Sequence, residues 1–163
     1  MDKVFETLQL FSKQCREAWE ESQKISFAAK YQNADALVIC GMGASCFGYY
    51  FLKTVFSSDL KIPLVLANSY HLPAFVNTNT LVITQSYSGN TEETLSCLSE
   101  AYDKNCLLTG ATMGEQLGKI LTEKNTSYYQ INGRFNPSLQ PRNGAGYTIF
   151  CLLVILSKLV ILN

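Results

Sequence analysis

The stretch Val82-Ile83-Thr84-Gln85-Ser86-Tyr87-Ser88-Gly89-Asn90-Thr91-Glu92-Glu93-Thr94 decides how this chain folds. It opens with apolar residues that suit a buried strand, and it continues through a turn rich in hydroxyls and a glycine. It ends where a helix can begin, and Asn90 with Glu93 three residues later forms a candidate capping pair. The stretch therefore predicts a strand, a polar turn and a helix in succession.

The turn in this stretch is a candidate phosphate cradle. Backbone N–H groups at a helix start lack intrahelical partners, and hydroxyls from Ser86, Ser88 and Thr91 could converge on them. The same residue types are also ordinary in a strand-to-helix turn, so a purely structural role stays open. Glu92 and Glu93 favour the helix dipole but repel an anion unless they point away.

A second turn of this kind lies earlier in the chain. The apolar run Ala36–Cys40 suits a parallel strand buried on both faces, and it leads into Gly41-Met42-Gly43-Ala44-Ser45. A helix is expected over residues 46–56. Ligands of open α/β sheets bind beyond the carboxyl ends of the strands, so Ser45 is either a helix cap, a ligand hydroxyl or both.

The sequence matches neither of two common nucleotide-binding motifs. The dinucleotide motif G-x-G-x-x-G would need glycine where Cys46 stands, and the next expected strand, Leu64–Ala67, ends at Asn68 rather than at an acid. No G-x-x-x-x-G-K-[ST] sequence is present, which excludes a P-loop. A nucleotide-binding α/β protein is therefore disfavoured.

The rest of the chain alternates apolar runs with helical stretches. Further strands are expected at residues 81–84, 106–109 and 127–131, with helices over residues 91–103 and 115–124. Such alternation implies right-handed crossovers and a parallel sheet. The predicted fold is α/β, a three-layer α/β/α sandwich with a five-stranded parallel sheet.

The N-terminal part is predicted to be helical. Residues 3–31 are rich in helix formers and lack glycine and proline. An apolar stripe at helical spacing is expected to pack on the domain's own sheet: Val4, Leu8, Phe11, Cys15 and Trp19. The expected organisation is an N-terminal helical segment over residues 1–34 and one α/β domain over residues 35–163.

The C-terminal stretch Tyr147–Leu162 is strongly apolar. It falls short of the ~20 residues that cross a bilayer, so we expect a buried helix in the core or at a subunit interface. Its apolar face suggests association, and we expect a homodimer.

Composition narrows the function further. The chain has 163 residues, and its 13 basic and 13 acidic side chains balance, so nothing favours nucleic acid or a membrane surface as a partner. Charges stand where a signal peptide needs an apolar run, and the six cysteines form no C-x-x-C pair, so a cytoplasmic protein is expected. A metal site is disfavoured because His71 is the single histidine; it is either solvated or in contact with substrate.

Arg142 closes an irregular loop that begins at Asn132. This loop follows the fifth expected strand, so it should emerge at the same sheet edge as the two polar turns. An arginine there can pair with phosphate or stabilise developing oxyanion charge. It can equally face solvent or an acid.

Three motifs in chain order resemble the sugar isomerase (SIS) domain. They are Gly41–Ser45, Ser86–Thr94 and Gln140–Arg142. Pro141-Arg142 followed by Gly146-Tyr147 resembles the first half of the bifunctional phosphoglucose/phosphomannose isomerases more narrowly, and the similarity covers the chain from about residue 36 onward. Ala44 stands where that family usually has another glycine, and Asn143-Gly144-Ala145 differs from its usual small apolar run.

The resemblance implies a phosphosugar at the strand ends, with no metal or organic cofactor. Fructose 6-phosphate, glucose 6-phosphate and mannose 6-phosphate are the implied ligands, and Arg142 is the implied catalytic arginine that stabilises enediolate-like charge. The implied substrate-binding residues are Gly43, Ser45, Ser86, Ser88, Gly89 and Thr91.

Length sets a limit on the expected activity. In the resembled family the catalytic glutamate and the histidine that opens the sugar ring lie in a second SIS domain, and His71 does not match that histidine. An aldose–ketose isomerase needs a positioned base, so the chain alone is expected to have little or no isomerase activity. The alternative is a non-catalytic phosphosugar-sensing SIS module, which needs the same cradle and no base.

Overall fold

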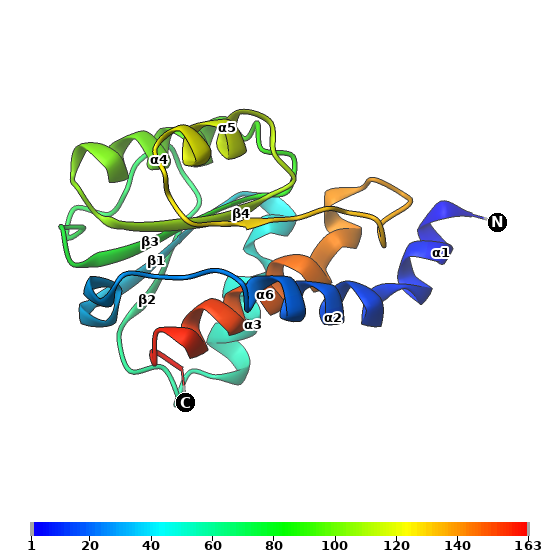
Figure 1. Cartoon of the computed structure of the whole chain (residues 1–163), viewed down its shortest axis with the longest axis horizontal. Helices are drawn as coiled ribbons and strands as arrows, with labels where there is room; N and C mark the ends of the chain where they lie inside the picture. Colours follow the sequence, from blue (N-terminus) through cyan, green and yellow to red (C-terminus); the bar gives the residue numbers. More distant parts are fainter. Residues whose placement is uncertain (1, 163) are drawn as a thin grey trace.

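Five parallel strands form one sheet in the order β2-β1-β3-β4-β5, in a computed structural model that describes residues 2–162 (Figure 1). The strands are β1 (Ala36–Cys40), β2 (Leu64–Ala67), β3 (Thr80–Ser86), β4 (Leu107–Thr112) and β5 (Tyr129–Gln130). The order reverses between β1 and β3. Parallel α/β sheets bind their ligands at such a reversal, beyond the carboxyl ends of the strands.

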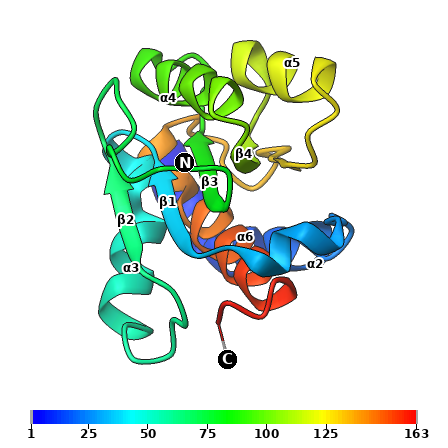
Figure 2. The ribbon, with the colours of Figure 1, turned by 90° about the vertical axis from the view of Figure 1, so that its left-hand side faces the viewer.

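Helices cover both faces of this sheet (Figure 2). One face carries α4 (Glu92–Asp103) and α5 (Glu115–Glu123), and the other carries α3 (Phe47–Val55) and α6 (Ala145–Lys158). Side chains alternate along the strands, so Val38 and Val82 pack in one apolar cluster while Leu37 packs in the other. The predicted three-layer α/β/α sandwich with five parallel strands is confirmed.

Strand and helix ends depart from the predictions by a few residues. β3 runs on to Ser86, and β4 runs on to Thr112. β5 is confined to two residues because it pairs only with Ala111 and Thr112 at the end of β4. The helix expected from residue 46 begins at Phe47, after a 3-10 turn, η2 (Gly43–Cys46).

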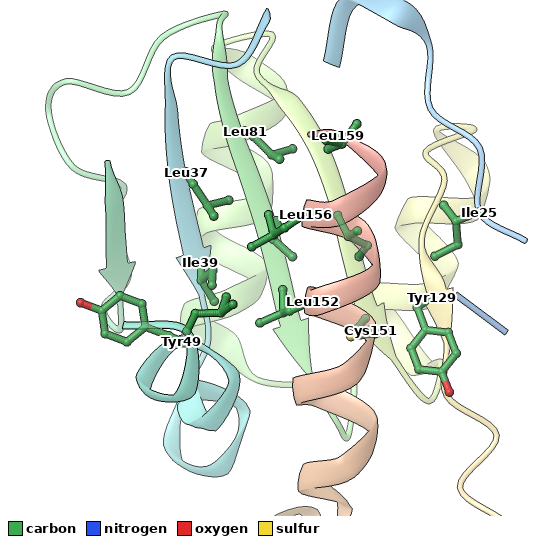
Figure 3. Close-up of a cluster of buried hydrophobic side chains, with 14 of the residues drawn as sticks. Ile25, Leu37, Ile39, Tyr49, Leu81, Tyr129, Cys151, Leu152, Leu156 and Leu159 are labelled. Atoms are coloured by element: carbon green, nitrogen blue, oxygen red, sulfur yellow. The ribbon is translucent and has the colours of Figure 1, made fainter. Parts of the chain in front are cut away.

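The apolar helix α6 lies in the core rather than at the surface. Figure 3 shows Leu152 and Leu156 of α6 beside the strands that carry Leu37 and Ile39, and Cys151 belongs to the same apolar cluster. The apolar side chains of α6 are therefore buried within the chain's own core, and they no longer argue for association with a second copy. No helix in residues 2–162 is both long and apolar enough to span a bilayer.

The predicted packing of the N-terminal segment is wrong. The segment forms α1 (Lys3–Gln9), α2 (Phe11–Ser22) and a 3-10 turn, η1 (Ala29–Asn33). The apolar stripe expected to pack on the sheet faces largely outward, with Leu8 58% and Trp19 44% exposed.

The face that the N-terminal helices bury is largely polar. It contains Thr7, Gln14, Glu17, Ala18 and Ser22. α2 packs on α6 rather than on the sheet, because α6 already covers that part of the sheet. A polar face then suffices, since the irregular segment before α6 offers hydrogen-bonding groups to it.

Candidate functional site

Three hydroxyls meet in the loop between β3 and α4. Ser86 Oγ lies 2.8 Å from Thr91 Oγ1 and 3.5 Å from Ser88 Oγ. Ser86 is the last residue of β3 and Thr91 is the N-cap of α4, so the strand end and the helix start hold the group together. The predicted convergence of these three side chains is present in the structure.

A fourth hydroxyl comes from the other polar turn. Ser45, in η2, is 6% exposed, and its Oγ accepts a hydrogen bond of 3.4 Å from the backbone N–H of Tyr87. Ser45 makes no side-chain capping bond to α3, so its interpretation as a helix cap is wrong. We call the four hydroxyls of Ser45, Ser86, Ser88 and Thr91, with the amides that face them, the cradle.

Backbone amides point into the cradle. The N–H groups of Gly89 and Asn90 donate to Ser86 Oγ and Ser88 Oγ at 3.0 and 3.4 Å. Thr91 caps α4 without a side-chain bond, so the first amides of this helix also lack a side-chain acceptor. Uncharged donors from two loops and a helix start thus converge, which is a favourable arrangement for an anion.

The predicted Asn90–Glu93 capping pair is wrong. Thr91 takes the N-cap position, and Asn90 Oδ1 instead accepts from the backbone N–H of Gln116 at 3.4 Å. Asn90 therefore ties the β3–α4 loop to the start of α5.

Glycine is required at Gly89, where φ is +81°. A Cβ atom at this position would lie 2.2 Å from the carbonyl oxygen of Gly114, in the loop between β4 and α5. Gly43, with φ of +54°, is exposed, and among the described residues no atom beyond its chain neighbours lies within 4 Å of its Cβ position. Both glycines therefore hold backbone shapes that other residues rarely adopt.

One of the two acids beside the cradle, Glu92, has a partner outside it. Glu92 is exposed, and its Oε2 accepts a 3.1 Å hydrogen bond from Tyr70 OH, in the segment after β2.

His71, in the same segment, bonds Glu100 through Nδ1 at 2.6 Å and is largely exposed. This bond and one from the backbone N–H of Leu72 lower the pKa of Glu100. His71 thus pairs with a residue far along α4, away from the cradle.

Arg142 lies in a 3-10 turn, η3 (Pro141–Gly144), which packs against η2. We call η3 the Arg142 turn. The Arg142 side chain is exposed and makes no hydrogen bond or ion pair within residues 2–162. The turn brings the arginine beside the turn that carries Ser45, as the position of the loop after the fifth strand predicts.

Tyr87 connects the cradle to the Arg142 turn, a role that was not predicted from the sequence. Its buried hydroxyl accepts a 2.8 Å hydrogen bond from Asn136 Nδ2, and burial raises its pKa. A Cβ atom on Gly144 would lie 2.4 Å from Tyr87 Cε2, so the Arg142 turn rests directly on this ring. The alternation Ser86-Tyr87-Ser88 was the available signal, because it places Tyr87 opposite the two serines.

Solved structures with this fold come from several organisms. A presumed phosphosugar isomerase from Clostridium difficile 630 matches 95% of this chain with a TM-score of 0.67 and 17% identity, over 46% of its own length. The Vibrio vulnificus NanR protein complexed with ManNAc-6P matches 93% with a TM-score of 0.66 and 14% identity, over 61% of its own length. At these identities the likeness shows the fold alone. No family model matches the sequence.

Relatives found by sequence comparison have more specific names than these solved structures. A bifunctional phosphoglucose/phosphomannose isomerase of Caldicellulosiruptor bescii is 36% identical over 157 residues, which is 96% of this chain and 45% of the relative. An isomerase of the same name from Aquifex aeolicus is 31% identical over 157 residues, which is 96% of this chain and 46% of the relative. The chain thus spans about half the length of these relatives.

The relatives at 31–36% identity, together with the parallel sheet and its strand order, define a sugar isomerase (SIS) domain. Within this class, the chain is similar to the bifunctional phosphoglucose/phosphomannose isomerases, and it corresponds to their N-terminal part.

Proposed function

We propose that this chain is the phosphosugar-binding SIS domain of a sugar-phosphate isomerase that interconverts glucose or mannose 6-phosphate with fructose 6-phosphate. One observation carries the proposal: hydroxyls from two separate loops, Ser45 on one and Ser86, Ser88 and Thr91 on the other, gather at the start of α4. The names of the relatives and the ManNAc-6P complex of NanR support a sugar phosphate as the ligand.

In this proposal the phosphate binds the cradle, and Gly43 and Gly89 give its backbone the required shape. A cradle of hydroxyls and amides attracts the dianion without a lysine that could exchange protons near the reacting carbon. The ligand would displace weak bonds, because two of the amide–hydroxyl distances are 3.4 Å.

Arg142 is the proposed catalytic residue. Proton transfer between C1 and C2 of the sugar develops enediolate-like charge, which a guanidinium stabilises without changing its own protonation. The exposed Arg142 side chain is unpaired within residues 2–162 and therefore available to the sugar. The base that moves the proton is expected in the second half of the longer relatives, so we expect little or no turnover by this chain alone.

Binding is the direct test. Calorimetry and thermal shift with fructose 6-phosphate and with NAD should show stabilisation by the sugar phosphate only. At a hundredfold excess over the dissociation constant the stabilisation should be about 2.7 kcal/mol. Stabilisation by NAD alone would refute the proposal.

Ser88→Ala tests the cradle itself. Ser88 is exposed and makes two weak bonds, so the fold should persist. Losing one hydroxyl to a charged ligand should weaken binding by about 1.5–3 kcal/mol. Ser99→Ala, an exposed serine on α4 beyond the cradle, is the matched control and should bind as the parent does. Unchanged affinity in Ser88→Ala would remove Ser88 from the site.

A phosphosugar sensor is the second candidate. It is favoured by the fold likeness to NanR, which was solved in complex with a sugar phosphate. A sensor and an isomerase domain predict the same binding. Aldose–ketose turnover by the longer protein that carries this segment, if there is one, distinguishes them: turnover supports the isomerase and its absence supports the sensor.

The proposal extends to organisation and location. We assign residues 1–34 to an N-terminal helical segment and residues 35–163 to the SIS domain. We propose a homodimer, with association through apolar side chains that the chain itself leaves exposed on α3, namely Phe47, Tyr50 and Val55. Light scattering that shows a monomer at high concentration would contradict this. The six free cysteines favour the cytoplasm.

A further inference from the structure

We propose that Gln14 on α2 is a positioning residue that holds the Arg142 turn beside the cradle. The inference rests on the proposed function, because it concerns the placing of Arg142. It assigns a role to the N-terminal helices, which contribute no residue to the cradle.

Gln14 reaches the backbone on both sides of the Arg142 turn. It is fully buried, and its Nε2 donates to the carbonyl oxygen of Asn143 at 2.9 Å and to that of Phe135 at 3.0 Å. Asn143 directly follows Arg142, and Phe135 lies in the loop that leads to the turn. One amide group therefore fixes the backbone next to the arginine from a helix more than a hundred residues earlier in the chain.

The approach of α2 to this region depends on a missing side chain. A Cβ atom on Gly146, in the first turn of α6, would lie 2.8 Å from Gln14 Cβ and 3.1 Å from Gln14 Oε1. Glycine at this position lets the helices come close enough for the Gln14 amide to reach the turn. Gln14 Oε1 itself has no partner within residues 2–162, so the two donated bonds are the contribution of this side chain.

Glu17, one helical turn further along α2, holds the same loop. It is 4% exposed, and it accepts hydrogen bonds of 2.9 Å from Asn132 Nδ2 and from Tyr147 OH. Tyr147 OH in turn accepts from the backbone N–H of Phe135 at 3.1 Å. Two neighbouring polar residues of α2 therefore reach the loop and turn that carry Arg142.

Tyr87 supports the turn from the other side. Its ring lies against Gly144, and its hydroxyl accepts from Asn136. The Arg142 turn is thus fixed between the cradle loop and α2. Without the Gln14 amide, the turn would keep its contact with Tyr87 but would no longer have a fixed backbone on the side of α2.

Hydrogen exchange tests the tether without any ligand. In Gln14→Met, a substitution of similar size that removes both donors, the Asn143 and Leu139 amides should exchange at least about tenfold faster relative to the amides of α5. These two amides are bonded to Gln140 and Asn136, so they report on the turn. Gln9→Met, the same change at an exposed position, should leave them unchanged.

A second control separates tethering from general destabilisation. Leu121→Ala removes a buried side chain of α5, in the apolar cluster on the face of the sheet opposite α6. It should accelerate exchange in α5 more than in the turn. If Gln14→Met produces the same pattern as Leu121→Ala, the proposed tether is wrong.

Binding then tests positioning. The probe is 5-phospho-D-arabinonate, whose carboxylate carries charge where an enediolate would, measured against inorganic phosphate. Gln14→Met and Arg142→Ala should each weaken the probe about tenfold or more and leave phosphate unaffected, since the cradle is intact. The double variant should bind no more weakly than Arg142→Ala alone.

The outcomes distinguish the two proposals. Additive losses in the double variant, or an unchanged affinity in Gln14→Met, overturn the positioning role. If Arg142→Ala binds like the parent, the arginine's proposed role fails and the positioning role fails with it. If the parent chain binds neither the probe nor phosphate, the proposed function fails, while the exchange result still decides whether Gln14 holds the turn.

Discussion

Helices α6 and α2 lie side by side and are held in opposite ways. α6 packs on the sheet almost entirely through apolar side chains such as Leu152 and Leu156 (Figure 3). α2 packs on α6 through a face that includes Gln14 and Glu17, and it leaves Trp19 exposed. Burial thus dominates the packing of α6, whereas directed hydrogen bonds hold α2 to Tyr147 and to the segment before α6.

The comparison shows that the two kinds of contact have different effects on the structure. Burial of apolar surface is non-directional, so it stabilises α6 without fixing any single atom closely. Hydrogen bonds from buried amide and carboxylate groups fix distances, and leaving such groups without partners is unfavourable. We therefore expect changes in α6 to affect stability most and changes in α2 to affect the Arg142 turn most.

The largest expected effect comes from the core side of α6. Leu152→Ala removes a fully buried side chain and should lower the free energy of unfolding by about 2–5 kcal/mol in urea denaturation. Ser157→Ala, at an exposed position of the same helix, should change it by less than about 0.5 kcal/mol. A loss in Leu152→Ala no larger than that of the control would contradict the core assignment of α6.

A smaller loss is expected from the polar side of α2. Glu17→Ala removes the acceptor of Tyr147 OH and the partner of Arg134 Nε, which lies 2.6 Å away. The ion pair contributes little because Arg134 is 65% exposed, so the expected loss is about 1–3 kcal/mol, mainly from the buried hydroxyl. Glu20→Ala, exposed on the same helix, is the control. Equal denaturation midpoints for the two variants would refute a structural role for Glu17.

Alkaline pH should weaken the same contact. Burial raises the pKa of Tyr147, and Glu17 raises it further. The neutral phenol is therefore favoured in the folded state, so this stability is fully present below the unfolded pKa of about 10 and is lost as the pH rises above it.

The size of this pH effect can be measured by comparison. At one unit above the unfolded pKa the loss from one such tyrosine is roughly 1.4 kcal/mol. Denaturation of the parent and of Tyr147→Phe at pH 8 to 11 should show a shallower alkaline decline in the variant. Parallel curves would show that Tyr147 does not titrate differently in the two states.

The smallest effect is expected on the outer side of the N-terminal helices. Leu8→Ser changes a side chain that is 58% exposed, so the monomer's unfolding free energy should change by less than about 0.5 kcal/mol. Thr7→Val on the adjacent face is the contrast, because Thr7 Oγ1 accepts from the backbone N–H of Ser138. A larger loss for Leu8→Ser than for Thr7→Val would mean that the apolar stripe is buried in solution.

The sheet and the cradle loops could be predicted from the sequence because their signals are local. The runs Ala36–Cys40 and Leu64–Ala67 match β1 and β2 to the residue. The turns that hold Ser45 and Ser88 follow strand ends, and parallel strands bring such turns to one edge.

The connections between distant segments could not be predicted in this way. Gln14 and Asn143 are 129 positions apart, and Glu17 and Tyr147 are 130 apart. Periodicity assigned the apolar side of α2 to the interior, because nothing in its own sequence shows that its neighbour is an irregular segment with free carbonyl groups. The burial of Gln14 and Glu17 can be inferred only when the structure of that neighbouring segment is known.

Successive side chains of Ser86-Tyr87-Ser88 point to opposite sides of the backbone, and this restricts how the segment can change in evolution. Its serines face the cradle while its tyrosine supports the Arg142 turn. Loss or gain of one residue here would exchange the two sides, placing an aromatic ring among the hydroxyls and a serine under Gly144. The segment should therefore tolerate a single substitution better than a single change in length.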